Sequence, residues 1–370
     1  MKALVVGGTG PTGPYLVNGL LARGYEVAIL HRGTHEIDEI PPEVEHIHVD
    51  PHFRETIDEG LKGRQFDLAI ATYGRIRIVA EALIGKTPRL VAVGGTPSMR
   101  GMVKPEDNFP IGMPIPAPET TQRIESKEEL DFGYLIRRTE DVVLKGHADG
   151  HYNSTMFRYP LVYGPNEISS FEWLIMKRVQ DRRRELILPD GGLTIVSRGY
   201  AENMAHAVLL AVDQPENSAG KLYHCADEQQ LTLGQWAQVI ARHMDWAFDI
   251  YGVPDEVAYT AREYLPIGTS ANHQMMDISQ IKADLGYRDI VPTVEAHRRT
   301  VNWLLAHKPD NDGKFTRRED PLQYAVEDQL IAIQKQALEQ MRAIEYRKKS
   351  TRHSYAHPKQ PGLGKDHRAR

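Results

Sequence analysis

A glycine-rich turn near the start of the chain constrains the fold more than any other feature. Residues 1–13 read MKALVVGGTGPTG, an apolar strand-like run followed at once by glycines, and apolar residues then recur at helical spacing over 14–23. This succession of strand, turn and helix is the setting of a dinucleotide-binding fingerprint, and a ligand-free turn fits it less well. Glycines permit the tight turn and the close approach of a pyrophosphate, and the helix N-terminus attracts the anion. The sequence therefore predicts phosphate contacts at Gly7, Gly8, Gly10, Pro11, Thr12 and Gly13.

The composition excludes several classes of protein. The chain has 370 residues, 41% hydrophobic and 26% charged, enough for one large α/β domain with a smaller lobe. The single cysteine, Cys225, excludes an internal disulfide and indicates a reducing compartment, so we expect a cytoplasmic protein with a buried structural thiol. No apolar run approaches the roughly 20 residues of a membrane span, and the first strand begins too early for a preceding signal peptide.

Strands and helices alternate over the first half of the chain. Strand-like runs occur at 3–6, 26–30, 46–49, 67–72, 89–93 and 154–158, and helical patterns at 14–23, 76–85 and 128–147. The alternation predicts an α/β fold with a Rossmann-type, doubly wound parallel sheet. The proline-rich region 97–127 is expected to be a long loop that begins at a strand end, where open α/β sheets bind ligands.

The second half has a mixed pattern. Helices are expected at 170–180, 200–213, 232–244 and 293–306, and short strands at 185–188, 193–197 and 221–225. We assign 1–165 to a cofactor-binding Rossmann domain with returning later segments, 166–308 to a substrate-binding α/β lobe, 309–346 to a linker and C-terminal helix, and 347–370 to a disordered tail. The C-terminal helix carries an apolar stripe of Val326, Leu330, Ile333, Ala337, Met341 and Ile344.

Charge is spread unevenly along the chain. The tail over 347–370 holds eight Lys or Arg against one acid, Asp366, whereas the whole chain has a net charge of −5. The body therefore offers no electrostatic attraction to nucleic acid, and such binding is expected, if at all, only from the tail.

Further segments follow the glycine turn in a recognisable order. They read HVD at 48–50, RYPLVYGP at 158–165, AENMAHAVLLAV at 201–212, GKLYHCADEQQLTLGQWAQVI at 220–240 and DISQIKADLGY at 277–287. Together with GGTGPTG they resemble, over roughly residues 1–308, the extended short-chain dehydrogenase/reductase family, also called the NAD-dependent epimerase/dehydratase family. The resemblance implies a small-molecule substrate, no membrane association, and a homodimer built through the helices at 76–85 and 128–147.

The end of the second strand bears on the choice of cofactor. An acid there would bind the adenosine ribose and repel a 2′-phosphate, but EVAILHRG ends in His31 and Arg32. Because a guanidinium matches phosphate geometry, we predict NADP(H) in preference to NAD(H), with stacking of Arg32 on the adenine as the alternative. The resemblance also implies cofactor contacts from Asp50, which a turn or cap role explains equally well, and from Thr72, Tyr73, Gly74, Tyr159, Pro160 and Val162.

The catalytic positions depart from the family pattern. Family members hold the substrate carbonyl with a Ser or Thr, transfer the proton with a Tyr, and lower that tyrosine's pKa with a Lys four residues later. Thr96, in LVAVGGTPSMRG at 90–101, falls on the hydroxyl position. The resemblance therefore predicts Thr96 as the group that polarises the substrate.

Two alignments place the tyrosine and lysine positions differently within FGYLIRRTE. Alignment on Gly133 and Glu140 puts Phe132 and Ile136 there, and neither side chain can transfer a proton or carry a charge. A second alignment uses Tyr134 and the arginine four residues later, but its two-residue shift turns the helix by about 200°. We favour Phe132 and Ile136.

The histidines do not predict a metal site. His46, His48 and His52 alternate along and beyond a strand with Asp50 between them, but no tetrahedral set with cysteine emerges. We therefore predict no metal.

Three functions remain open. The first is an NADPH-dependent reductase, epimerase or dehydratase acting on a bulky ketone, aldehyde or sugar-like molecule, and we favour it. The second is a dinucleotide-binding regulatory protein without catalysis. The third, implied by plastid members of the family that bind RNA and lack the tyrosine, is an RNA-associated relative, with only the basic tail in its support.

Overall fold

A seven-stranded parallel sheet organises the longer of the two compact units, Met1–Glu327 and Asp328–Arg370, into which the chain divides. The structure, a computed structural model, describes residues 1–167, 171–268, 271–309 and 321–346. The strand order is β3 (Glu45–His48), β2 (Glu26–His31), β1 (Lys2–Val6), β4 (Leu68–Ala71), β5 (Arg89–Gly95), β6 (Asn153–Tyr159) and β10 (Lys221–His224). Every pair is parallel. This order confirms the predicted Rossmann-type sheet, extended by one strand.

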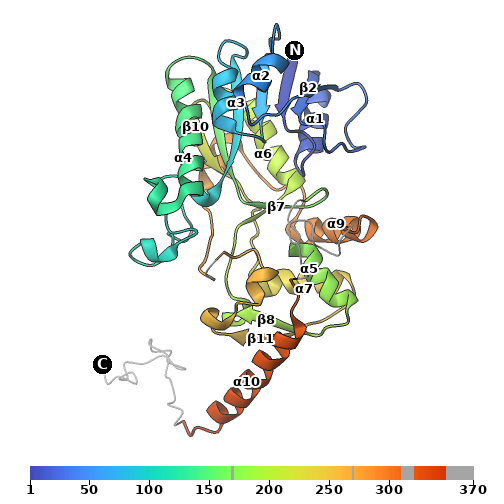
Figure 1. Cartoon of the computed structure of the whole chain (residues 1–370), viewed down its shortest axis with the longest axis vertical. Helices are drawn as coiled ribbons and strands as arrows, with labels where there is room; N and C mark the ends of the chain where they lie inside the picture. Colours follow the sequence, from blue (N-terminus) through green and yellow to red (C-terminus); the bar gives the residue numbers. More distant parts are fainter. Residues whose placement is uncertain (168–170, 269–270, 310–320, 347–370) are drawn as a thin grey trace, which may run out of the picture. The chain divides into compact units, whose positions relative to one another are not determined.

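Helices cover both faces of this sheet (Figure 1). One face packs against α1 (Gly13–Ala22), α6 (Ala201–Asp213) and α8 (Ser279–Leu285), and the other against α2 (Arg54–Gly60), α3 (Ile76–Ala82) and α4 (Lys127–Ala148). Side chains alternate along each strand, so Ala3 and Val5 join the first core while Leu4 and Val6 join the second. Because both faces are buried, a central strand such as β4 is apolar throughout.

The later elements of the same unit form two small parallel sheets and a group of helices. β7 (Leu161–Tyr163) pairs with β9 (Arg198–Tyr200), and β8 (Glu185–Pro189) pairs with β11 (Asp249–Val253). Helices α5 (Phe171–Gln180), α7 (Leu233–His243) and α9 (Thr293–Ala306) pack against one another. Single 3-10 turns occur at Thr96–Ser98, Pro105–Asp107, Asp190–Gly192, Asp255–Val257 and Ala261–Glu263.

The C-terminal helix, α10 (Tyr324–Arg342), begins in the first unit. There Glu327 forms an ion pair with Arg178 of α5, and both side chains are fully buried. The helix continues in the second unit, where Ile333 and Met341 of the predicted stripe are exposed and Ile344 lies beyond the helix end. The tail over 347–370 and residues 310–320, in the expected linker, lie outside the described residues.

Several local expectations were wrong. The strand expected at 193–197 does not form: Ile195 and Val196 make only isolated bridges, and the strand of this region is β9, which starts at Arg198. The segment is apolar, but among the described residues it makes only these bridges and pairs with no strand that would complete a ladder. The short elements α2, α8, β7 and β11 were missed, because each spans too few residues to show a period.

Cys225 is buried, as expected. None of the described helices is long and apolar enough to cross a membrane.

Candidate active site

The glycine turn joins β1 to α1 with a backbone that needs glycine. Gly7 and Gly8 have φ angles of 110° and 93°, which L side chains rarely adopt. A Cβ on Gly13 would lie 2.1 Å from the carbonyl oxygen of Gly8, whereas a Cβ on Gly10 would meet nothing within 4 Å. The first turn of α1 contains a proline and no acidic residue. The helix N-terminus beside the open side of Gly10 therefore suits a phosphate.

The residues around the turn are held by the neighbouring strands. Pro11 is half-buried, and Thr12 is buried at the N-cap of α1. Thr72, which follows β4, donates its hydroxyl hydrogen bond to the backbone oxygen of Val6 at 3.1 Å. Gly74 has a φ of 88°, and a Cβ there would lie 2.6 Å from the backbone oxygen of Pro51. The loop after β4 is thus fixed against the end of β1 and against the segment after β3, at the carboxyl edge of the sheet.

A polar group forms at the carboxyl ends of β2, β3 and β4. Arg32 is exposed, with its guanidinium carbon 5.7 Å from the ring centre of Tyr73. His52 meets the same ring edge-on at 5.3 Å and donates to Asp50 from its backbone (3.0 Å) and from Nδ1 (2.6 Å). Partial burial raises the pKa of Asp50, but the hydrogen bonds from His52 outweigh this effect and hold the pKa below its usual value. An arginine, an aromatic face and a carboxylate therefore meet where an adenosine would lie in this fold.

His31 faces away from this group. Its side chain is buried, and its Nε2 lies 3.1 Å from Nδ1 of His46 on the neighbouring strand β3. The structure therefore joins His31 to the histidines of β3, whereas His52 is paired with Asp50.

The predicted contacts at the end of β6 differ in exposure. Tyr159 is buried in the sheet core, and its hydroxyl donates to the backbone oxygen of Met204 at 3.0 Å. Val162 is half-buried against the same core. Pro160 lines a small pocket at the end of β5.

Thr96 lines this pocket, which is small, with a volume of about 20 Å³. Its walls include four methionines, and its polar side chains are a threonine, a serine and a glutamine. These residues are Met99, Met102, Met113, Met276, Thr96, Ser197 and Gln274. Within the described part of the chain, no Lys, Arg, Asp or Glu lines the pocket. It therefore places Thr96, at a strand end, in surroundings that favour apolar groups.

Helix α4 approaches the Thr96 segment through two residues of one face. Gly133 is buried, and a Cβ there would lie 2.4 Å from the backbone oxygen of Pro97. Ile136, three residues later, is close to the end of β5: a Cβ on Gly95 would lie 3.8 Å from its Cδ1. Glycine at 133 thus lets the helix come close enough to place Ile136 beside the residue that precedes Thr96.

The two aromatic candidates on α4 lie on either side of Gly133. Phe132 is 63% exposed, and Tyr134 is half-buried. Phe132 is four residues before Ile136 and so shares its side of the helix, whereas Tyr134 is turned away from that side by about 200°. The backbone at Leu130 is extended (φ −161°, ψ 104°), so the regular turns that carry these residues begin after it.

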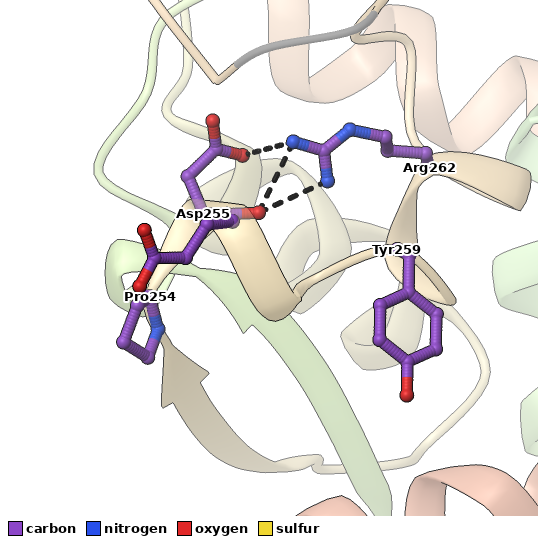
Figure 2. A pocket seen from close by; sticks show the side chains of 5 residues that line it. Pro254, Asp255, Tyr259 and Arg262 are labelled. Carbon is purple, nitrogen blue, oxygen red and sulfur yellow. Dashed lines mark hydrogen bonds and ion pairs between the residues drawn. The ribbon is translucent and has the colours of Figure 1, made fainter.

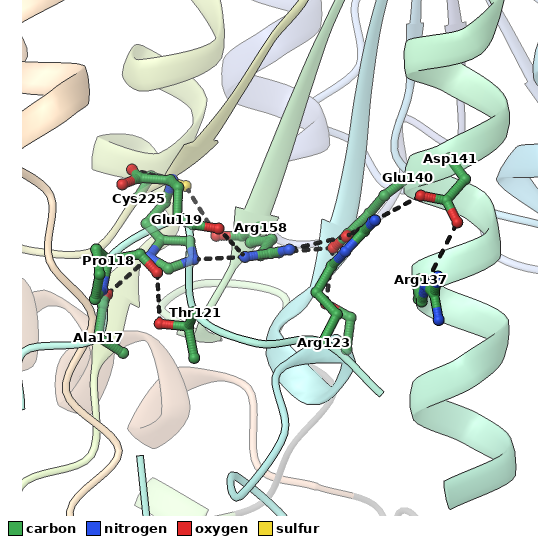
Figure 3. A network of polar contacts seen from close by, with 12 residues as sticks. Ala117, Pro118, Glu119, Thr121, Arg123, Arg137, Glu140, Asp141, Arg158 and Cys225 are labelled. Carbon is green, nitrogen blue, oxygen red and sulfur yellow. Dashed lines mark hydrogen bonds and ion pairs between the residues drawn. The ribbon is translucent and has the colours of Figure 1, made fainter. Parts of the chain in front are cut away.

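Beneath the pocket, a buried ion pair joins α4 to β6 (Figure 3). Glu140 is fully buried and accepts hydrogen bonds from Arg158 at 2.6 Å and 2.9 Å. Ser98 donates to the same carboxylate at 2.7 Å, and Arg123 donates at 3.0 Å. Burial opposes ionisation, but the bonds from Arg158 and its neighbours lower the pKa of Glu140. The carboxylate therefore ties the segment after Thr96 to α4 and β6.

The same arginine reaches the long loop over 97–127. Arg158 donates to the backbone oxygen of Glu119 at 3.2 Å and to Nε2 of His224 at 3.0 Å. Because a guanidinium only donates, His224 must accept at Nε2 and carry its proton on Nδ1, which faces the backbone oxygen of Ala117 at 3.2 Å. The backbone N–H of His224 donates to the carboxylate of Glu119 at 3.0 Å. The backbone and the side chain of His224 therefore both hold the loop against the edge strand β10.

This arrangement predicts a pH dependence of stability. Burial, together with Arg158, lowers the pKa of His224 to about 4, from the 6.5 of a free histidine. Between these two values the unfolded chain takes up a proton that the folded chain excludes, so stability is lost as pH falls. We expect wild type to lose on the order of 3 kcal/mol more than His224→Gln by pH 4, because glutamine keeps both hydrogen bonds without titrating.

The measurement is urea unfolding at a series of pH values from 7 to 4. The control is His243→Gln, a histidine on the exposed end of α7, which should follow wild type. Parallel curves for wild type and His224→Gln would contradict the prediction.

A shallow hollow after β11 is lined by a different set of residues (Figure 2). It is lined by Pro254, Asp255, Glu256, Tyr259 and Arg262. The guanidinium of Arg262 donates to the carboxylate of Asp255 at 2.7 Å and to its backbone oxygen. None of the residues predicted to bind cofactor or substrate lines this hollow.

Sequence reasoning missed most of the pocket wall and all of the buried network. Three of the methionines, Met99, Met102 and Met113, lie in the loop predicted over 97–127. Their concentration in a proline-rich loop was a signal for an apolar wall. The pairing of Glu140 with Arg158 left no such signal, because it depends on how α4 lies on the sheet.

These features define a class of fold: a Rossmann sheet with a glycine turn between β1 and α1 and a small pocket at the end of β5. The solved structures that resemble it are NAD-dependent epimerases and dehydratases. UDP-glucose 4-epimerase of Thermotoga maritima with UDP-glucose has a TM-score of 0.65 at 16% identity, covering 84% of this chain and 100% of that one. dTDP-glucose 4,6-dehydratase of Bacillus anthracis with NAD has a TM-score of 0.65 at 14% identity, covering 83% and 97%.

The chain therefore has the fold of the NAD-dependent epimerases and dehydratases, as the sequence resemblance predicted. Among curated proteins it is similar to a 4-hydroxy-2-methyl-3-oxo-4-farnesyl-3,4-dihydroquinoline-1-oxide ketoreductase of Stigmatella aurantiaca, with 22% identity over 70% of this chain and 78% of that one. It is also similar to the uncharacterized protein YbjS of Escherichia coli strain K12, with 21% identity over 48% of this chain and 58%, less than two thirds, of that one. No family model matches the chain.

Proposed function

We propose that the protein is an NADPH-dependent oxidoreductase that reduces the carbonyl group of a largely apolar small molecule. The observation that carries this proposal is the lining of the small pocket at the end of β5, where Thr96 stands beside Met99, Met102, Met113 and Met276. A sugar nucleotide would bring a diphosphate, whose charges call for cationic side chains, and none lines the pocket in the described residues. The name of the Stigmatella relative, a ketoreductase of a farnesyl-bearing substrate, supports the same substrate class.

The residues of the chain would divide the work as follows. The cofactor, when bound, supplies the hydride; the glycine turn would hold its phosphates and the loops after β2 to β4 its adenosine. The Thr96 hydroxyl would donate a hydrogen bond to the substrate oxygen as negative charge grows there. Phe132 and Ile136 would form an apolar wall, since neither can move a proton. The proton would then come from water or from a hydroxyl of the substrate.

The packing of α4 supports the alignment that puts Phe132 and Ile136 at the tyrosine and lysine positions. Ile136 lies beside the end of β5, and Phe132 shares its side of the helix. Tyr134 lies on a different side, so a direct proton transfer from its hydroxyl is not part of the proposal.

The proposed test is consumption of NADPH in the presence of two groups of substrates. Ketones and aldehydes with long apolar substituents should be reduced, and UDP- or dTDP-sugars should be neither reduced nor epimerised. Turnover of the sugar nucleotides alone would contradict the substrate class.

Cofactor preference is a separate prediction. We expect NADP to bind more tightly than NAD, because the guanidinium of Arg32 is exposed at the end of β2 and matches a 2′-phosphate. Arg32→Asp should weaken NADP binding about 10- to 100-fold and NAD binding much less. Calorimetric titration of both cofactors measures this, with Lys62→Asp as a control at another exposed position. Equal affinity for the two cofactors in wild type would contradict it.

Assembly is also proposed rather than observed. We expect a homodimer formed through α3 and α4, which pack side by side over one face of the sheet. The exposed apolar residues Ile333 and Met341 of α10 offer a second surface. Light scattering at micromolar concentration should give twice the mass of the chain, and a monomer mass would refute the proposal.

Two other functions compete with the enzyme. A regulatory dinucleotide-binding protein would bind NADPH yet reduce no member of the carbonyl panel. An RNA-associated protein would bind RNA in a salt-dependent manner and lose that binding when 347–370 is deleted. We also propose a cytoplasmic location, which is expected from the single cysteine.

A further inference from the structure

Four metal-binding side chains meet at the edge of the sheet, beyond the adenosine end of the proposed cofactor site. They are His31 at the end of β2, His46 and His48 on β3, and Glu36 in the loop between these strands. One ligand atom from each lies within 4.8 Å of all the others. The group differs from the one considered from sequence, because His52 is paired with Asp50 instead.

The sheet itself brings the three histidines together. His46 and His48 are two residues apart on β3, so their side chains leave the strand on the same face. His31 is the register partner of His48 on the neighbouring strand. Three of the four donors are therefore held by backbone pairing and not by flexible loops, which is the preorganisation that a metal site needs.

We propose that His31, Glu36, His46 and His48 form a binding site for a divalent transition-metal ion, with Zn²⁺ as the preferred ion. Three imidazoles and one carboxylate form a donor set that Zn²⁺ accepts in tetrahedral geometry. In such a site, bonds of about 2.1 Å put neighbouring ligand atoms about 3.4 Å apart. The observed separations are 3.1 Å for His31 Nε2 to His46 Nδ1, 3.2 Å for His48 Nε2 to Glu36 Oε1, and 3.8 Å for His46 Nδ1 to the same oxygen.

The ring arrangement supports the same conclusion. The three imidazoles have centroids 4.9 to 5.8 Å apart and meet at interplanar angles of 70° to 87°, so their edges, which carry the nitrogens, approach one another without stacking. His31 is buried, whereas the side chains of His48 and Glu36 are 51% and 54% exposed. An ion can therefore enter from the solvent side and reach the inner donors.

Binding at His31 has a small cost in hydrogen bonding. The backbone N–H of Gly33 donates to Nδ1 of His31 over a long 3.3 Å, so Nε2 carries the ring proton in the metal-free protein. A metal at Nε2 moves that proton to Nδ1 and breaks this one weak bond.

The position of the site indicates its role. β2 is three strands away from β5, about 14 Å at the usual spacing, so the ion does not reach a substrate held at Thr96. The ion would instead bind the segment between His31 and Glu36 to the edge strand β3, and this segment carries Arg32. We therefore assign the ion a structural role beside the adenosine pocket, independent of whether the protein is a reductase.

The test is titration of the full chain, without a histidine tag and stripped of metal by a chelator, with ZnCl₂ in calorimetry and with Co²⁺ in visible absorption. Wild type should bind Zn²⁺ at this site and give the intense absorption bands of tetrahedral Co²⁺. His46→Gln and His48→Gln should weaken Zn²⁺ binding at least about 10- to 100-fold, since even outer-shell partners contribute that much. Thermal unfolding of wild type, but not of these variants, should shift to higher temperature with Zn²⁺.

Two further variants make the result decisive. Glu36→Gln removes one ligand from an exposed loop position and leaves both strands unaltered, so it keeps the test valid if a strand variant fails to fold. His52→Gln removes a nearby histidine outside the group and should bind Zn²⁺ as wild type does. Equal Zn²⁺ affinity in wild type, His48→Gln and Glu36→Gln would assign the ion to other histidines and overturn the proposal, as would the absence of binding.

Discussion

Replacing Thr96 with valine should lower the turnover of an apolar ketone about 10²- to 10⁴-fold while leaving the affinity for NADPH unchanged. Valine keeps the size and branching of threonine, so the apolar wall of methionines is preserved and only the hydroxyl is lost. A donor aimed at the oxygen that gains charge in the transition state contributes an effect of this size. Single-turnover rates and NADPH titration of Thr96→Val separate the two quantities.

The matched control is Tyr134→Phe, which removes the hydroxyl of the rival proton donor. It should change turnover by less than about threefold, because helical geometry turns this residue away from the side that carries Ile136. A large loss in Tyr134→Phe with Thr96→Val nearly intact would show that the second alignment of α4 is the right one. An equal and small loss in both would show that neither hydroxyl assists the reaction and would contradict the role proposed for Thr96.

Replacing Arg158 with methionine should lower the free energy of unfolding by about 3 to 5 kcal/mol. Methionine fills the apolar volume of the side chain but leaves the buried carboxylate of Glu140 with less charge compensation, and removing one partner of a buried pair has a cost of this order. The same change at Arg64, whose pair with Glu45 is partly exposed, should cost less than about 1 kcal/mol. Urea unfolding of both variants provides the comparison.

A double variant, Glu140→Gln with Arg158→Met, tests the reason for the effect. If the loss comes from an uncompensated charge, the double variant should be less destabilised than the sum of the two single variants, because no buried ion remains. Additive losses would show instead that each side chain contributes through its own packing.

The sequence predicted the features that repeat over a short stretch. The strand, glycine turn and helix around Gly7 to Gly13 follow from local spacing, and the apolar runs of β1, β2, β4, β5 and β6 follow from their burial on both faces. The segment at 193–197 shows the limit of that reasoning, because its apolar residues belong to a loop that has only isolated bridges. An apolar run indicates burial, but the presence of a partner strand decides whether it becomes a strand.

The residues of the candidate site could be predicted only where a local sequence motif identifies them. Thr96 and the glycines were found from motifs, but Arg158 bonds to Glu140 and to His224, which lie 18 and 66 positions away along the chain. Only the packing of α4 and β10 on β6 brings these three residues together. The same holds for His31 and His48, which meet because of strand register. Spacing along the chain carries no information about such pairs.

The anchoring of the long loop through His224 has a consequence for how such a protein could change its substrate. The loop that supplies Met99 and Met113 also follows directly from Thr96, and its far end is held by hydrogen bonds from His224 of β10 to Ala117 and Glu119. Exchanging the loop for that of a relative would therefore alter the ligand cavity. It would also remove these hydrogen bonds to β10 unless residue 224 were exchanged with the loop. Ligand preference and mechanical integrity are coupled at this one strand, so new preferences would arise more readily from single methionine replacements than from loop transplants.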